Sequence, residues 1–238
     1  IVPAVSDALT YELDGAVAVV RLDDGKANAI GPDTVTALDE ALTRAEAEAG
    51  ALLLLGREGK FSAGFDLSVM TSGEEAMRSL VRSGAELLVR IYGSPLPTVA
   101  AANGHALAMG ALLLLATDTR LGAEGAYKVG LNEVAIGMGL PIFAVELARH
   151  RLSPADFTAA TIQGQVYDPA GARAAGYLDR LVAVDELEAT ARAEAARLSE
   201  LRRGALAHTK VRARQATIDH ILATLDVDMA ATGMPDPR

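Results

Sequence analysis

The chain has 238 residues, of which 50% are hydrophobic but only 4% aromatic, and it contains no Trp. This length suits one large domain, or one domain with an appendage, whose core is built from Ala, Val, Leu and Ile. A formal net charge of −9 without a long basic run argues against nucleic acid and anionic membranes as partners. Because the sequence has no cysteine, disulfides, thiol catalysis and thiolate metal sites are excluded.

Metal and membrane signals are weak as well. The four histidines show no ligand spacing, so we predict no metal dependence. The longest apolar run, residues 106–117, is too short to span a bilayer. No signal peptide is visible at the start of the given sequence, and we expect a soluble, cytoplasmic protein.

The first two-thirds of the chain alternates strand-like and helix-like segments. In chain order, the predicted elements are a strand at 16–23, a helix at 32–48, a strand at 51–56, a helix at 74–92, a strand at 98–104, a helix from about Met109 and a strand near 119–124. The first helix is indicated by helical spacing of Val35, Leu38 and Leu42, with Pro32 suited to its first turn. This βα rhythm predicts an α/β domain with largely buried sheets.

The composition changes near Ser153. Predicted helices then follow at about 153–164, 185–201 and 208–225, with solvated charges on one side. We therefore divide the chain into a core at 1–152 and a C-terminal helical region at 153–238.

One acid stands out because of its surroundings. Glu133 lies in "GLNEVAIGMGLPIF", residues 130–143, a stretch of glycines and apolar side chains with no neighbouring cation. An unpaired carboxylate is costly to bury, so such a group is usually either exposed or functional. From local features alone, an exposed loop acid or a helix-capping group is the preferred interpretation.

Two glycine-containing turns precede predicted helices. They are "FSAGFDL", residues 61–67, and "NGHALAMGALLLL", residues 103–115. The first N–H groups of a helix lack internal partners and carry partial positive charge. Two such ends facing each other would form an oxyanion hole, although a glycine before a helix is too common to establish one.

Taken together, these motifs resemble the crotonase superfamily, the enoyl-CoA hydratase/isomerase family. The segments "KANAI" at 26–30, "FSAGFDL", "PTVAAANGHALAMGALLLLATDTRLGAE", "YKVGLNEVAIGM" and "QGQVYDPAGARAAGYLDRLV" agree in order and spacing, over nearly the whole chain. The resemblance implies an α/β crotonase (ClpP-like) fold of stacked ββα turns. It also implies a C-terminal helical region that mediates assembly into a homotrimer or a dimer of trimers.

The resemblance further implies acyl-CoA ligands, with coenzyme A as part of the substrate and no separate cofactor. The thioester oxygen would accept hydrogen bonds from the main-chain N–H groups of Phe65 and Met109. The position of Met109 is usually Gly in the family, so its side chain must turn away or narrow the acyl pocket. The residues matched to CoA and substrate contacts are Lys26, Ala27, Ala29, Ala63, Gly64, Asp66, Leu67, Gly110 and Leu112.

Glu133 aligns with a catalytic glutamate shared by hydratases and isomerases of the family. Hydratases of the best-known type add a second glutamate, and this chain has Leu112 at that position. "GLNE", residues 130–133, is similar to the segment around the lone catalytic glutamate of mitochondrial Δ3,Δ2-enoyl-CoA isomerases. The resemblance thus favours a one-glutamate shuttle that moves a 3,4 double bond to the 2,3 position.

Two other functions stay open. One is a hydratase that combines Glu133 with a further acid such as Glu74, Glu75 or Glu146. The other is a catalytically silent homologue that binds acyl-CoA. This alternative is kept because Met109 stands at a position that is usually Gly in the family.

Several residues also have simpler structural interpretations. Asp66 suits a helix cap better than a base. His105 is expected to be a packed or partly exposed loop residue. Met138 is expected in the core, and Lys210 and Arg212 on a solvated helix face rather than at a CoA phosphate.

Overall fold

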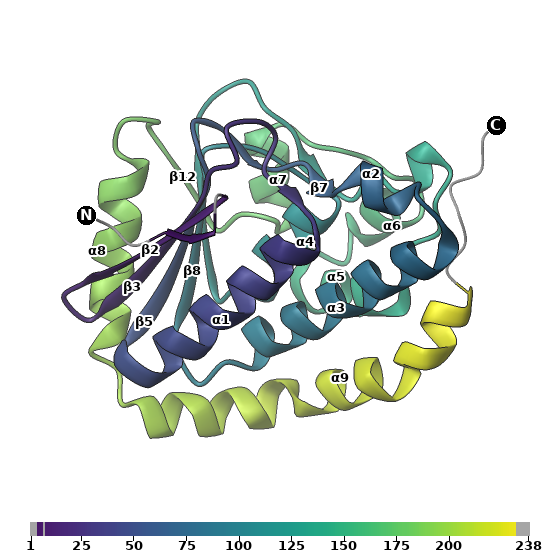
Figure 1. Ribbon diagram of the computed structural model, residues 1–238. Coiled ribbons are helices and arrows are strands. Elements are labelled where there is room, and N and C mark those ends of the chain that lie inside the picture. The colour runs from purple at the N-terminus through teal and green to yellow at the C-terminus, as the bar shows by residue number, and fades with distance from the viewer. Residues whose placement is uncertain (1–3, 7, 232–238) are drawn as a thin grey trace.

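The computed structural model describes residues 4–6 and 8–231 (Figure 1). A seven-stranded sheet has the order β1-β2-β3-β5-β8-β10-β12. Its strands are β1 (Ala4–Ser6), β2 (Leu9–Asp14), β3 (Val17–Leu22), β5 (Ala51–Leu55), β8 (Thr98–Ala102), β10 (Thr119–Ala123) and β12 (Arg180–Val182). Strands β1 to β3 pair antiparallel, and every pairing from β3 to β12 is parallel.

The parallel strands are buried on both faces. All five residues of β5, "ALLLL", and of β8, "TVAAA", are buried, as expected for strands covered by helices on both sides. Helix α8 (Leu187–Ser199) packs on β5 and β8, and α1 (Pro32–Glu48) lies over the opposite face (Figure 1). The predicted bounds of α1 are confirmed.

A second, small parallel sheet lies beside the first and has the order β11-β9-β6. It consists of β6 (Gly59–Ser62), β9 (Gly104–Leu107) and β11 (Val129–Gly130). The predicted strand at 98–104 is therefore wrong in its extent, because the chain leaves the large sheet after Ala102 and enters the small one at Gly104. Only glycine fits there, since a Cβ on Gly104 would lie 1.9 Å from the carbonyl carbon of Gly59.

The two sheets and the helices repeat in a regular order. Strands β5, β8 and β10 of the large sheet are each followed by one strand of the small sheet, and then by helix. The helices that complete these turns are α2 (Leu67–Met70) with α3 (Glu74–Gly93), then α4 (Met109–Ala116), and then α5 (Ile142–Arg151). This arrangement confirms the α/β fold of stacked ββα turns.

The C-terminal region contains α6 (Phe157–Thr161), α7 (Pro169–Ala175), α8 and α9 (Arg203–Ala231). It is not purely helical as predicted, because β12 adds a parallel strand beside β10. Asp179 holds that strand in place by accepting hydrogen bonds from the main-chain N–H and Nε of Arg120, at 2.7 and 3.0 Å. The helix predicted at about 153–164 is shorter than expected, because α6 begins at Phe157 and ends at Thr161. The division at residues 152/153 and the trimer or hexamer stay predictions.

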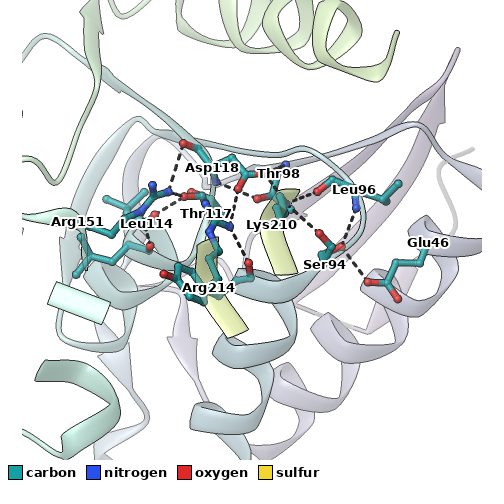
Figure 2. Close-up of polar contacts among 12 residues, drawn as sticks. Glu46, Ser94, Leu96, Thr98, Leu114, Thr117, Asp118, Arg151, Lys210 and Arg214 are labelled. Atoms are coloured by element: carbon teal, nitrogen blue, oxygen red, sulfur yellow. Dashed lines mark hydrogen bonds and ion pairs between the residues drawn. The ribbon is translucent and has the colours of Figure 1, made fainter. Parts of the chain in front are cut away.

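Helix α9 runs beside α3 and α5 and is anchored by a buried ionic cluster (Figures 1 and 2). The Nζ of Lys210 donates to the carbonyl oxygens of Ser94 and Leu96, at 3.0 and 2.6 Å, and lies 2.6 Å from Oδ2 of Asp118. Arg214 pairs with the other carboxylate oxygen at 2.8 Å. The prediction of a solvated Lys210 is therefore wrong, whereas Arg212 is exposed as predicted. In the described part of the chain, no helix is both long and apolar enough to cross a membrane.

Candidate functional site

Three chain segments leave the same edge of the small sheet. Because β6, β9 and β11 are parallel, their carboxyl ends lie side by side. Phe65 follows β6, Met109 follows β9 and Glu133 follows β11. The topology therefore gathers the three predicted catalytic residues at one end of this sheet.

The first two segments are in direct contact through Gly64. Its φ of +103° belongs to a region that favours glycine. A Cβ added there would lie 2.9 Å from the Cβ of Ala108 and 3.5 Å from the main-chain nitrogen of Met109. The bare backbone of Gly64 thus lets the turn after β6 approach the start of α4.

The N–H of Phe65 is oriented by a short parallel pair. Strand β7 (Gly64–Phe65) pairs with β4 (Ala29–Ile30), and the N–H of Asp66 donates to the carbonyl of Ile30 at 3.0 Å. In a parallel ladder, this pattern directs the N–H of Phe65 to the side of β7 opposite β4.

The N–H of Met109 belongs to the first residue of α4. Ala108, the cap, has φ 49° and ψ −121°, a conformation that a residue with a side chain seldom adopts. Its own N–H donates to the carbonyl of Gly130 at 3.1 Å, and its carbonyl accepts from the N–H of Leu112 at 3.0 Å. The next N–H, that of Met109, lies in the first turn, where a helix has no internal acceptor for it.

The side chain of Met109 turns into the protein. It is fully buried, and its methyl group lies against Gly84 of α3. This places the side chain against α3, and its effect on the acyl pocket stays a prediction.

Glu133 is buried, with 8% of its surface exposed, although it carries a carboxyl group. Its Oε2 atom is buried and has no hydrogen-bond partner, which is true of only a few side-chain atoms among the described residues. Burial raises the pKa of Glu133 to about 7. Its main chain is fixed, because the carbonyl accepts from the N–H groups of Ile136 and Met138, at 3.0 and 2.9 Å. The exposed-acid interpretation of Glu133 is therefore wrong, and a carboxyl group with this pKa can both accept and return a proton near neutral pH.

The residues matched to CoA contacts come from two segments that lie side by side, residues 26–29 and residues 63–64. The carboxylate of Asp24 accepts from the N–H groups of Lys26 and Ala29, at 2.7 and 3.2 Å. The N–H of Ala63 then donates to the carbonyl of Ala27 at 3.0 Å. Lys26, Ala27, Ala29, Ala63 and Gly64 are thus brought together next to Phe65.

The remaining predicted site residues differ in exposure. The carboxylate of Asp66 accepts from the N–H of Ser68 at 2.8 Å and caps α2, as predicted, while Leu67 is 67% exposed. Gly110 packs closely on β6, because a Cβ there would lie 2.4 Å from the carbonyl oxygen of Ser62. Leu112 is 2% exposed.

Other candidate residues have partners away from this edge. Nδ1 of His105 accepts from the N–H of Lys128 at 3.2 Å, which is a structural contact. Glu74 pairs with Arg78, and Glu146 pairs with Arg149, at 3.2 and 3.3 Å. A groove of about 580 Å³ near Lys210 and Arg214 is lined by none of the candidate site residues.

Two residues near the site were not singled out from the sequence. Gly84 contacts both Phe65 and Met109, and the available signal was a glycine inside a predicted helix. Tyr177 is fully buried, and burial, together with the nearby Glu133 carboxylate, raises its pKa. No local pattern in the sequence marks this tyrosine.

Known proteins resemble the chain over most of its length. The family described as enoyl-CoA hydratase/isomerase matches residues 12–232. Mitochondrial enoyl-CoA delta isomerase 1 from Homo sapiens is 29% identical over 218 residues, covering 90% of this chain and 72% of the relative. A probable enoyl-CoA hydratase from Bacillus subtilis is 35% identical over 142 residues, covering 58% of this chain and 54% of the relative.

A solved structure agrees over almost the whole chain. An enoyl-CoA hydratase/isomerase family protein from Pseudomonas syringae superposes with a TM-score of 0.94 at 41% identity. The match covers 97% of this chain and 100% of that protein.

Proposed function

We propose that this chain, which belongs to the enoyl-CoA hydratase/isomerase family, shifts the double bond of a 3-enoyl-CoA to the 2-enoyl position. The observation that carries the proposal is the buried carboxyl group of Glu133, whose Oε2 has no hydrogen-bond partner. Similarity to the human delta isomerase over 90% of this chain and 72% of that protein supports the same reaction.

The reaction needs one base and two hydrogen-bond donors. The carboxylate of Glu133 removes a proton from C2 of the substrate, and the electron pair delocalises into a dienolate with its negative charge on the thioester oxygen. The N–H groups of Phe65 and Met109 donate to that oxygen and stabilise the charge. Protonated Glu133 then returns the proton at C4, which leaves the double bond between C2 and C3.

The atoms and electrons of this reaction balance without a cofactor. The proton that leaves C2 returns at C4, so no water, oxidant or reductant is consumed. Coenzyme A takes part only as a portion of the substrate, and we assign its contacts to the segment containing Lys26, Ala27 and Ala29. A pKa of about 7 lets Glu133 act as base and then as acid in the same turnover.

Leu112 supports isomerisation over hydration. Hydration requires a water molecule that is held and activated, typically between two acidic groups. Leu112 is apolar and 2% exposed, and it stands where hydratases of the best-known type carry the second glutamate. An apolar group at this point helps to keep water away from the dienolate.

Hydration is the second candidate, because the Bacillus subtilis relative is named a probable hydratase. It would require a second acid near Glu133. The three acids considered for that role are less suitable: Glu74 and Glu75 are exposed, and Glu146 pairs with Arg149.

Turnover with two substrate classes tests the proposal. The protein is incubated with 3-enoyl-CoAs of several chain lengths and, separately, with trans-2-enoyl-CoAs. We expect conjugated 2-enoyl-CoA from the first class and little 3-hydroxyacyl-CoA from the second. Rapid hydration without isomerisation would favour the hydratase, and binding without turnover of either class would favour a silent acyl-CoA-binding protein.

A further inference from the structure

Gly84 occupies an unexpected place in α3. It lies inside a helix of 20 residues and is buried. Glycine is less favourable than alanine in a helix interior, and its φ is not in the left-handed region that would require it. The space around Gly84, rather than its conformation, therefore accounts for the missing side chain.

That space is filled by the two residues whose N–H groups we assign to the oxyanion hole. A Cβ on Gly84 would lie 2.5 Å from Cζ and 2.6 Å from Cε1 of Phe65. It would also lie 3.5 Å from the terminal methyl of Met109. The ring of Phe65 and the side chain of Met109 thus both rest on the bare backbone at Gly84.

This contact completes the restraint on Phe65. On one side, β7 is tied to β4 through the bond from Asp66 to Ile30, at 3.0 Å. On the other side, the aromatic ring meets α3 at Gly84. A ring that is pushed outward would strain the backbone at Phe65, and we expect this strain to reorient its N–H.

We propose that Gly84 is a positioning residue, which sets the direction of the N–H groups of Phe65 and Met109 by giving their side chains a fixed seat on α3. This inference rests on the proposed function, because it needs both groups to act on the substrate. It goes further by assigning a role to Gly84 in α3, a helix that carries neither hydrogen-bond donor. Gly84 itself contacts no reacting atom.

Gly84→Ala is the direct kinetic test. Misplacement of catalytic groups by about 1 Å can cost about 100-fold in rate, so we expect kcat to fall about 10- to 100-fold. KM for the 3-enoyl-CoA should stay within about threefold, because the residues assigned to CoA keep their own hydrogen bonds, such as that from the N–H of Ala63 to the carbonyl of Ala27. The control is Gly204→Ala in α9, where an added Cβ meets nothing within 4 Å, and it should keep wild-type kinetics. Wild-type kcat in folded Gly84→Ala would overturn the inference.

A rescue experiment separates positioning from a folding defect. Phe65→Leu removes the ring atoms that the new methyl would strike and keeps the main-chain donor. The double variant Gly84→Ala/Phe65→Leu should recover kcat severalfold over Gly84→Ala, toward the value of Phe65→Leu alone, or fold where the single variant does not. Phe65→Leu alone also tests the contact and should lower kcat moderately. A double variant no better than Gly84→Ala, beside an active Phe65→Leu, would contradict the proposal.

A spectroscopic measurement distinguishes this inference from the proposed function. Hydrogen bonds to the thioester oxygen lower the carbonyl stretching frequency of bound 2-enoyl-CoA, whether or not turnover occurs. We expect this infrared shift in the wild type and a smaller shift in Gly84→Ala. A wild type without the shift would overturn the proposed oxyanion hole and this inference with it. A shift kept in full by Gly84→Ala would overturn this inference alone.

Discussion

The N–H of Ala108 donates to the carbonyl oxygen of Gly130 at 3.1 Å, and this bond joins the segment that carries Met109 to the segment that carries Glu133. It continues the pairing of β9 with β11 one residue beyond Leu107, the last residue of β9. The proposed acid–base group and one proposed oxyanion donor are therefore set by neighbouring strand ends rather than by mobile loops.

The rate should depend on pH through the ionisation of Glu133. Because the first step needs the carboxylate and burial raises its pKa to about 7, kcat/KM should fall about tenfold per pH unit below pH 7. The measurement is the initial rate with a 3-enoyl-CoA from pH 5 to pH 9. A flat profile down to pH 5 would contradict the assigned role.

The same ionisation should affect stability. In the folded protein the pKa of Glu133 is raised from 4.5 to about 7, so the folded state holds a proton that the unfolded chain has lost between these values. Its contribution to stability is thus complete below pH 4.5 and is lost as the pH rises through 7. Above pH 7 the cost reaches roughly 3 kcal/mol.

Glu133→Gln, which has no charge to bury, should therefore be more stable than the wild type at pH 8, with little difference at pH 4. Urea denaturation at both pH values measures this difference. Equal free energies of unfolding at pH 8 would show that Glu133 is more solvated than its burial indicates.

Leu112 should determine how well water is excluded. Leu112→Glu places an acid where the best-known hydratases have one, so hydration of 2-enoyl-CoA should rise and isomerisation should fall. Leu112→Gln is the matched control, similar in size and polar but unable to act as a base. The readouts are 3-hydroxyacyl-CoA formation and the free energy of unfolding. If neither variant changes the ratio of the two activities, Leu112 has no part in selecting the reaction.

The ionic cluster at α9 should make a large contribution to stability (Figure 2). Burial alone would raise the pKa of Asp118, but Lys210 and Arg214 outweigh this and lower it. Asp118→Asn leaves these buried cations without their carboxylate, which should cost about 3 kcal/mol at pH 7. Because the pKa of Asp118 is lower in the folded protein than in the unfolded chain, its carboxylate stabilises the fold at pH values above the unfolded pKa of about 4. The destabilisation by Asp118→Asn should therefore shrink as the pH falls below about 4.

Asp226→Asn is the control for that experiment. Asp226 also pairs with an arginine, Arg82, but its side chain is 90% exposed. Removing an exposed pair should change the free energy of unfolding by less than about 1 kcal/mol. Equal losses from the two substitutions would contradict a special role for the buried cluster.

Much of the fold could be predicted because local pattern determines it. The helical spacing of Val35, Leu38 and Leu42 predicted α1, and the apolar run at 51–56 predicted β5, which ends at Leu55. The break at Asn103 could not be read, since it depends on the close approach of Gly104 to Gly59. Likewise, β12 depends on Arg120, and the burial of Lys210 depends on Asp118, both distant in sequence.

The site divides in the same way. The glycine turns indicated where free N–H groups occur, but their roles came from the family resemblance. Whether Glu133 was exposed or buried depends on packing between separate segments, which periodicity does not reveal. Gly84 was overlooked because its proposed role depends on the space that a missing side chain leaves for Phe65 and Met109, and the sequence alone does not show that these residues fill it.

The most direct test of the central claim is the turnover of a 3-enoyl-CoA by Glu133→Gln at pH 7.5. The amide has nearly the same shape but cannot accept the C2 proton, so kcat should fall by about 10²- to 10⁴-fold while the Kd for the substrate changes little. An isomerisation rate equal to that of the wild type would contradict the one-glutamate mechanism.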